Sequence, residues 1–219
     1  MGYPGAMSVD QSATLAPRLT RKGQATRDRI VAAAAELMFE RGVAGTSTDD
    51  VRAAAGVSTS QIYHYFKDKK DLVRAVIAHQ TEAILDSQQP LLSRLDSFEA
   101  LQQWRDFLVD LQRQRHYQGG CPLGSLGSEL AESDDEARAD VAAGFARWEQ
   151  PIREGLHAMR DRGELRRDAD PDQLGLAVLT ALQGGLLLTQ VRRDTVALEA
   201  ALDAMLALVA SYRTTKANG

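Results

Sequence analysis

Apolar residues recur every three or four positions along most of the chain, which is the spacing of one face of an α-helix. The segment 27–41 shows this pattern clearly, with a single stripe formed by Ile30, Ala33, Ala34, Leu37 and Met38. Gly42 follows the stripe, and glycine is a common residue just past a helix C-terminus. The segment is therefore predicted to be an amphipathic helix that ends at residue 41.

The stretch TSTDDVRAAAGVSTSQIYHYF contains two further helix starts close together. Ser47 and Ser58 are each followed three residues later by a side chain that can complete a capping box, Asp50 and Gln61 respectively. Gly56 lies between the two starts and allows a left-handed turn. Two short helices joined by such a turn, and braced by the preceding helix, are typical of a helix-turn-helix.

The rest of the chain also follows a helical period. The segment 172–192 is apolar on nearly all sides, so we expect it to be buried on more than one face. Further helices are predicted from Asp68 to the break before Pro90, then at 96–115, as a short helix within 119–130, and at 134–163, 172–192 and 196–211.

The predicted fold class is all-α, with an N-terminal three-helix helix-turn-helix domain and a C-terminal helical bundle. We expect a flexible N-terminal segment at 1–20, the helix-turn-helix domain at 21–70 and the larger helical domain at 71–219.

The composition fits a soluble globular protein, because 44% of the 219 residues are hydrophobic and 26% are charged. No apolar run reaches the roughly 20 residues needed to cross a bilayer, and the first residues lack the features of a secretory signal. Cys121 is the single cysteine, so no internal disulfide can form. We therefore expect a cytoplasmic protein with no membrane partner.

The formal net charge of −4 is unevenly distributed. Residues 18–70 contain ten Lys/Arg and six Asp/Glu, which gives this part a charge of +4 and leaves −8 for the rest. A basic end on an acidic body steers a polyanion such as DNA toward the basic end. A surplus of this size also occurs on ordinary solvated surfaces.

The segment 27–76 resembles the DNA-binding region of the TetR family of transcriptional regulators. Its landmarks are FERG at 39–42, TS at 46–47, AAGVS at 54–58, YHYF at 63–66, and Lys69 before Leu72. So many landmarks in register are more specific than one short motif. In addition, GCPLGSLGSEL at 120–130 resembles a segment of the LmrA/YxaF-type subgroup, whose members control drug-efflux or flavonoid-linked genes.

The resemblance implies that residues 59–65 form the recognition helix, which lies in the major groove of a double-stranded DNA operator. Alternatively, the Gln61 side chain completes the capping box instead of contacting DNA. A second alternative is that one tyrosine packs inward with Ile62 and Phe66. A basic leading arm, formed by Arg18, Arg21, Lys22 and Arg27, could follow the DNA backbone. We expect base-edge contacts from Thr59, Ser60, Gln61 and His64, and phosphate contacts from Thr46, Ser47, Tyr63, Tyr65 and Lys69.

A single recognition helix reads only a few base pairs, so a specific operator needs two copies. We expect a homodimer on a pseudo-palindromic site, joined through the helices at 172–192 and 196–211 in a four-helix bundle. The alternative is that these helices fill an intramolecular core. The interface candidates are Ala181, Gly184, Gly185, Leu188, Leu202 and Met205.

The resemblance also implies that the domain at 71–219 binds a small-molecule effector as well as a second copy. The candidate lining residues are Trp104, Phe107, Leu108, Leu111, Cys121, Phe145, Trp148 and Met159. The alternative is that this aromatic stripe is ordinary core. No cofactor or metal site is expected, because four scattered histidines and one cysteine lack ligand spacing. The expected function is a repressor that a small apolar or aromatic ligand releases from its operator.

Two other functions are kept as alternatives. The first is a non-inducible DNA-binding or architectural helical protein. The second is an enzyme, which the residues disfavour. The sequence LGSLG at 123–127 lacks the first glycine of a nucleophile elbow, and no orienting Asn/Asp pattern accompanies Cys121 with His116 or His157.

Overall fold

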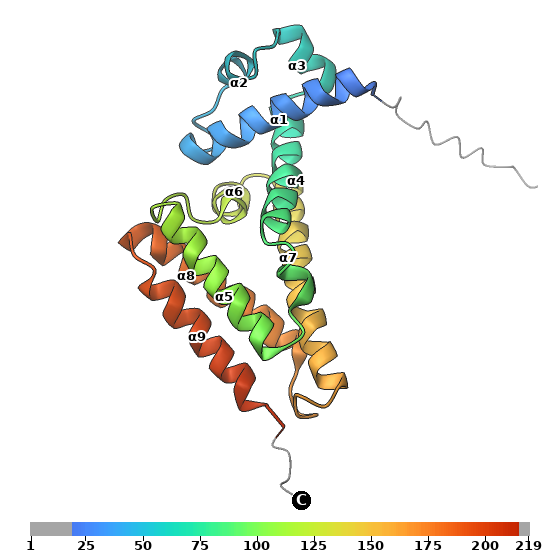
Figure 1. Ribbon diagram of the computed structural model, residues 1–219. Helices are drawn as coiled ribbons and strands as arrows, with labels where there is room; N and C mark the ends of the chain where they lie inside the picture. The colour runs from blue at the N-terminus through green and yellow to red at the C-terminus, as the bar shows by residue number, and fades with distance from the viewer. Residues whose placement is uncertain (1–18, 215–219) are drawn as a thin grey trace, which may run out of the picture.

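The computed structural model describes residues 19–214, whose regular secondary structure is helical (Figure 1). Nine α-helices and one short 3-10 turn, Leu92–Arg94, occur within this range. The same residues contain no strand beyond an isolated bridge between Leu165 and Arg213. The all-α prediction is confirmed. The expected flexible segment at 1–20 falls almost wholly outside the described residues.

Helices α1 (Arg21–Arg41), α2 (Thr48–Ala55) and α3 (Thr59–Tyr65) lie together at one end of the molecule in Figure 1, and we call them the head. α1 begins at Arg21 rather than at the predicted residue 27. Thr20 caps it, because its hydroxyl accepts a hydrogen bond from the Gly23 amide at 3.1 Å. The apolar stripe begins only later in the helix, so the hydrophobic period could not reveal this start.

The predicted basic arm is therefore different in the structure. Arg21, Lys22 and Arg27 are helical residues of α1, and Arg18 lies outside the described residues. The Arg27 guanidinium stands over the ring of Phe66, 5.2 Å from its centroid, so it helps to pack α1 on the end of α3.

Both predicted capping boxes are present. The Ser47 hydroxyl accepts from the Asp50 amide at 3.1 Å, and the Asp50 carboxylate accepts from the Ser47 amide at 2.9 Å. Ser58 and Gln61 make the same exchange, at 3.2 and 2.8 Å. Between the two helices Gly56 has φ +62°, a left-handed conformation in which a Cβ would be strained. The helix-turn-helix prediction is confirmed.

Helix α4 (Lys69–Ser87) leads from the head along α7 (Asp135–Asp161), as Figure 1 shows. Two arginine–carboxylate links join these helices. Arg74 contacts Asp140 at 2.7 Å, and Arg147 makes a bidentate pair with Glu82 at 2.6 and 3.0 Å. A bidentate pair fixes orientation as well as distance, so α4 is held in register with α7.

The body consists of α7 together with α5 (Phe98–Gln114), α6 (Pro122–Leu130), α8 (Pro171–Arg192) and α9 (Val196–Ser211). α8 packs against both α7 and α9, and α9 also packs on α5. By length and composition α8 could cross a membrane, in contrast to the expectation from the sequence, but 44% of its most apolar window is buried inside this fold. Packing between α7 and α9 accounts for much of its apolar character.

A buried hydrogen-bond node joins the end of α4 to the body. The side-chain oxygen of Gln88 accepts from the indole N–H groups of Trp104 at 2.9 Å and Trp148 at 3.2 Å. The side-chain nitrogen of Gln88 donates to the Ile84 carbonyl at 3.0 Å. Both buried indoles are thereby satisfied, which is the condition for placing them in a core at low cost.

Candidate nucleic-acid interface and ligand cavity

Helix α3 divides its residues between the core and the solvent. Ile62 and Phe66, the residue just after the helix, are each 2% exposed and belong to the hydrophobic core, as predicted. The opposite side carries hydrogen-bonding groups that no part of the described chain covers, which is what a recognition helix requires. The exposed residues on that side are Thr59, Ser60, Gln61, Tyr63 and His64.

The two tyrosines of α3 have different environments. Tyr63 is 57% exposed, so its phenol can reach a DNA phosphate. Tyr65 is half-buried and packs against the core, with its ring edge-on to His64 at 4.8 Å between centroids. The Tyr65 hydroxyl is also near α1, 3.5 Å from the point where a Cβ on Gly23 would lie. Tyr65 therefore packs α3 on α1, and its expected phosphate contact stays a prediction.

Two expected phosphate donors are engaged inside the protein. Thr46 is 1% exposed and its hydroxyl donates to the Gly42 carbonyl at 2.8 Å, so its side chain is not available to DNA, contrary to the expectation. The exposed Ser47 hydroxyl donates to the Asp50 carboxylate at 2.5 Å. This hydrogen bond is the main reason why the pKa of Asp50 lies below its ordinary value. Ser47 would have to leave Asp50 in order to bind a phosphate.

Gln61 and Lys69 each have one partner within the chain. The Gln61 side-chain oxygen accepts from the Ser58 amide at 2.8 Å, so the capping alternative is realised and only the side-chain nitrogen is left to face DNA. The half-buried Lys69 ammonium donates to the Val43 carbonyl at 2.6 Å. Since an ammonium has three donors, Lys69 can hold this carbonyl and still meet a phosphate.

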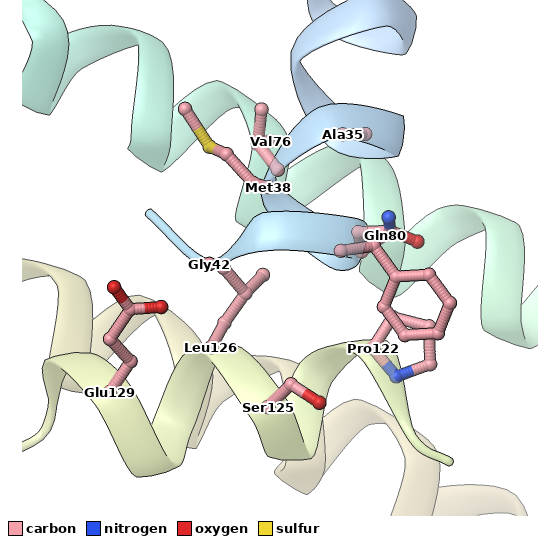
Figure 2. Close-up of a pocket in the computed structure, with 10 residues that line it drawn as sticks. Ala35, Met38, Gly42, Val76, Gln80, Pro122, Ser125, Leu126 and Glu129 are labelled. Carbon is pink, nitrogen blue, oxygen red and sulfur yellow. The ribbon is translucent and has the colours of Figure 1, made fainter. Parts of the chain in front are cut away.

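The α1–α2 loop has a second partner that the sequence did not reveal. The Glu129 carboxylate of α6 accepts from the backbone amides of Val43 at 2.8 Å and Ala44 at 2.6 Å. Figure 2 shows Glu129 on α6 beside Gly42, next to a cavity of about 150 Å³ between α1, α4 and α6. A local pattern carries no signal for a contact between residues so far apart in sequence.

A second cavity, the inner cavity, lies between α4, α5, α6, α7 and α8 and has a free volume of about 80 Å³. Four of the eight predicted lining residues meet there: Leu108, Leu111, Cys121 and Trp148. Burial raises the pKa of the Cys121 thiol. The thiol therefore stays neutral and contributes an apolar surface to the cavity rather than a nucleophile. The other lining residues are Gln80, Ala83, Ile84, Ser87, Gln88, Gln112, Arg115, Gly120, Pro122 and Leu186.

The other four predicted lining residues do not reach this cavity. Trp104 and Met159 are 0% exposed and are ordinary core residues. Phe107 and Phe145 are half-buried and pack against the hydrophobic core elsewhere. An amphipathic stripe identifies the buried face of a helix, and only part of such a face borders a cavity.

The predicted dimer residues fall into two groups. Gly185 and Leu202 are buried within the chain, so the expectation that they lie at a subunit interface is corrected. A Cβ on Gly185 would lie 2.8 Å from the Leu198 Cα, which shows that this glycine permits close packing of α8 on α9. Met205 is half-buried against the core. Gly184 and Leu188 are exposed, and Ala181 is half-buried.

An exposed apolar face nevertheless runs over α8 and α9. Its large residues are between 43% and 70% exposed, although such residues are usually scattered singly on a monomer surface. We call this the α8–α9 face, and it comprises Leu176, Leu187, Leu188, Val191, Val196 and Leu208.

Comparison with known proteins identifies both parts of the chain. Residues 30–76 match the family described as bacterial regulatory proteins, tetR family. Residues 94–205 match the family described as tetracyclin repressor-like, C-terminal domain.

Individual relatives agree with these matches. A helix-turn-helix regulator of Lactococcus lactis subsp. lactis is 30% identical over 81% of this chain and 90% of its own length. The transcriptional repressor DhaR of Mycobacterium sp. (strain GP1) is 25% identical over 77% of this chain and 84% of its own length. A TetR regulator from Chloroflexus aurantiacus superposes with a TM-score of 0.74, at 28% identity, over 89% of this chain and 98% of its own. The chain belongs to the TetR family of DNA-binding transcriptional regulators.

Proposed function

We propose that this regulator is a homodimeric repressor, which binds a pseudo-palindromic operator and leaves it when a small apolar or aromatic ligand fills the inner cavity. The observation that carries the proposal is the exposed side of α3, whose hydrogen-bonding residues lie on the basic end of an otherwise acidic chain. The repressor role is supported by the description of the relative DhaR as a repressor.

The α3 side chains suggest a division of tasks on DNA. Thr59 and His64 are exposed and can exchange hydrogen bonds with base edges in the major groove. Tyr63 and Lys69 are suited to phosphates, which position the protein and give no sequence information. The charge of +4 over residues 18–70 supports this orientation, because phosphate neutralisation supplies most of the non-specific affinity.

The α8–α9 face supports the homodimer. An apolar patch of this kind on a helix pair suits a second copy, because a two-fold axis would place α8 and α9 against the same two helices of the partner. Leu187, at 60% exposed, is a suitable probe. We expect Leu187→Glu to shift the protein to the monomer mass in sedimentation, whereas a monomeric wild-type chain would refute the proposed dimer.

Helix α6 supports a route from the inner cavity to the head. Pro122, at the start of α6, lines the cavity, and Glu129, on the same helix, binds the loop between α1 and α2. A ligand that favours another position of α6 would therefore favour another position of the loop. Such a ligand shifts the DNA equilibrium only by its difference in affinity for the two arrangements.

The test begins with selection of duplexes from a random library by the purified protein. We expect the enriched sequences to contain two-fold symmetric half-sites, and the affinity to fall steeply between about 50 and 200 mM salt. Thr59→Ala and His64→Ala should change the base preference, whereas Lys69→Ala should weaken all sequences about equally. Enrichment of asymmetric or unrelated sequences would contradict the proposal.

A ligand screen then separates the repressor from a non-inducible DNA-binding protein. We expect at least one small aromatic compound to stabilise the protein thermally and to release the selected duplex. A broad screen that produced neither effect would support the non-inducible alternative.

A further inference from the structure

One polar group in the wall of the inner cavity has no partner. Gln112 of α5 is 3% exposed, and its side-chain oxygen accepts no hydrogen bond from any residue that the structure describes. Buried polar atoms are nearly always paired in folded proteins, because an unpaired one loses its hydrogen bonds to water without replacement. An orphaned amide in a cavity wall is therefore a candidate ligand contact.

The second buried amide of the cavity wall shows what a purely structural glutamine looks like. Gln88 accepts from Trp104 and Trp148 and donates to Ile84, so its oxygen and its nitrogen both have partners. Gln112 lies in the same wall, but its side-chain oxygen has no partner among the described residues. The contrast marks this oxygen as an acceptor that a ligand could use.

The remaining wall restricts the size and the chemistry of an occupant. A free volume of about 80 Å³ is well below the roughly 300–1,000 Å³ of pockets for drug-sized molecules. The side chains of Leu108, Leu111 and Leu186 provide apolar contacts, and Trp148 adds an aromatic one. The burial of Cys121 keeps its thiol neutral, so it adds no charge. The space is about half of the roughly 150 Å³ cavity that holds a benzene ring, so an occupant has at most one small ring and widens the cavity when it enters.

We propose that Gln112 selects a small effector of the phenol class: one aromatic ring with one hydroxyl. This rests on the proposed function, in which the inner cavity receives the effector. The hydroxyl can donate a hydrogen bond to the unpaired Gln112 side-chain oxygen. The ring would occupy the apolar part of the cavity beside Trp148.

The test compares phenol with toluene, which replaces the hydroxyl by a methyl group of similar size. Binding is measured by calorimetry and by fluorescence of the two tryptophans, one of which lines the cavity. We expect wild-type protein to bind phenol about tenfold tighter than toluene, the value of one hydrogen bond. We also expect Gln112→Met to remove the difference. Equal affinities in the wild type, binding of neither compound, or unchanged discrimination in Gln112→Met would overturn the proposal.

Gln114→Met is the matched control. It makes the same change on the same helix α5, but Gln114 is exposed and does not line the inner cavity. This variant should keep the preference for phenol. Benzoate supplies a further arm, because Arg115 also lines the cavity and would attract a carboxylate. Tighter binding of benzoate than of phenol would overturn the phenol class.

Operator release, measured on the same samples, distinguishes this inference from the proposed function. If phenol binds through Gln112 but does not release the duplex, the assignment of Gln112 stands and the effector role of the cavity fails. If aromatic ligands release the duplex without preferring a hydroxyl, the effector role stands and the assignment of Gln112 fails.

Discussion

The Glu129 carboxylate accepts a hydrogen bond from the Val43 backbone amide at 2.8 Å, although the two residues are 86 positions apart. The neighbouring Ala44 amide donates to the same carboxylate at 2.6 Å, and the Lys69 ammonium binds the Val43 carbonyl at 2.6 Å. The loop between α1 and α2 is therefore held by α6 of the body and by Lys69 at the start of α4.

Glu129→Gln should loosen this loop without unfolding the protein. The substitution removes the negative charge and one of the two acceptors, and we expect a loss of about 1 kcal/mol at an exposed site. The Val43 and Ala44 amides should exchange with deuterium several-fold faster, because exchange reports local opening.

Glu132→Gln is the control for Glu129→Gln, since it makes the same charge change close by and Glu132 binds neither loop amide. Equal exchange at Val43 and Ala44 in wild type and Glu129→Gln would show that the carboxylate does not restrain the loop.

Thr46→Ala should reduce stability and leave the salt dependence of DNA binding unchanged. Its buried hydroxyl donates to the Gly42 carbonyl, so its loss costs about 1–2 kcal/mol in denaturant unfolding. A phosphate contact would instead lower the slope of log affinity against log salt by about one. Lys69→Ala should lower both the stability and the salt slope, because Lys69 binds the loop and is a proposed phosphate contact. A reduced slope in Thr46→Ala would restore the original expectation for this residue.

The Glu82–Arg147 pair between α4 and α7 should make stability fall in acid. The hydrogen bond from Arg147 is the main reason why the pKa of Glu82 lies below its ordinary value of 4.5. A depressed folded pKa contributes stability that is present above the unfolded pKa and is lost as the pH falls through the folded pKa. The contribution stays within about 1 kcal/mol, since both side chains are about half exposed and water screens the pair.

The difference in unfolding free energy between wild type and Glu82→Gln isolates this effect from other carboxylates. We expect the difference to be constant near neutral pH, to shrink below about pH 4.5, and to be smaller in 1 M salt. A difference that grows toward acid would have the wrong sign for this pair.

Local rules predicted the head well, since the decisive groups are neighbours in sequence. One capping box joins Ser47 to Asp50 and the other joins Ser58 to Gln61, each within one helical turn. Gly56 adopts the left-handed conformation because it has no Cβ. The start of α1 was missed because the helical turns that follow its cap, Thr20, carry none of the apolar stripe, which begins at Ile30.

The candidate sites were predicted less completely, because their polar residues act at long range or inside the core. Glu129 looks like any exposed acid until α6 is placed beside the α1–α2 loop. A hydrophobic pattern assigns glutamine to the surface, yet Gln88 and Gln112 are buried. The same pattern could not separate the two neighbouring glycines of α8, since both lie in an apolar segment.

Gly184 and Gly185 thus provide a matched pair that separates the packing of one chain from the packing between chains. In Gly185→Ala the new Cβ would lie 2.8 Å from the Leu198 Cα, so we expect the variant to lose roughly 1–3 kcal/mol of unfolding free energy. In Gly184→Ala the Cβ meets no atom within 4 Å, and the higher helix propensity of alanine, up to about 1 kcal/mol, favours the fold of the single chain. Gly184 lies beside Leu187 and Leu188 on the α8–α9 face, where a methyl group would obstruct close approach of a partner.

Sedimentation should therefore show a weaker dimer for Gly184→Ala, and denaturant unfolding at high protein concentration should show a less stable fold for Gly185→Ala. Unaltered unfolding of Gly185→Ala would contradict the close contact of α8 with α9, and an unaltered dimer in Gly184→Ala would move the subunit interface away from this glycine.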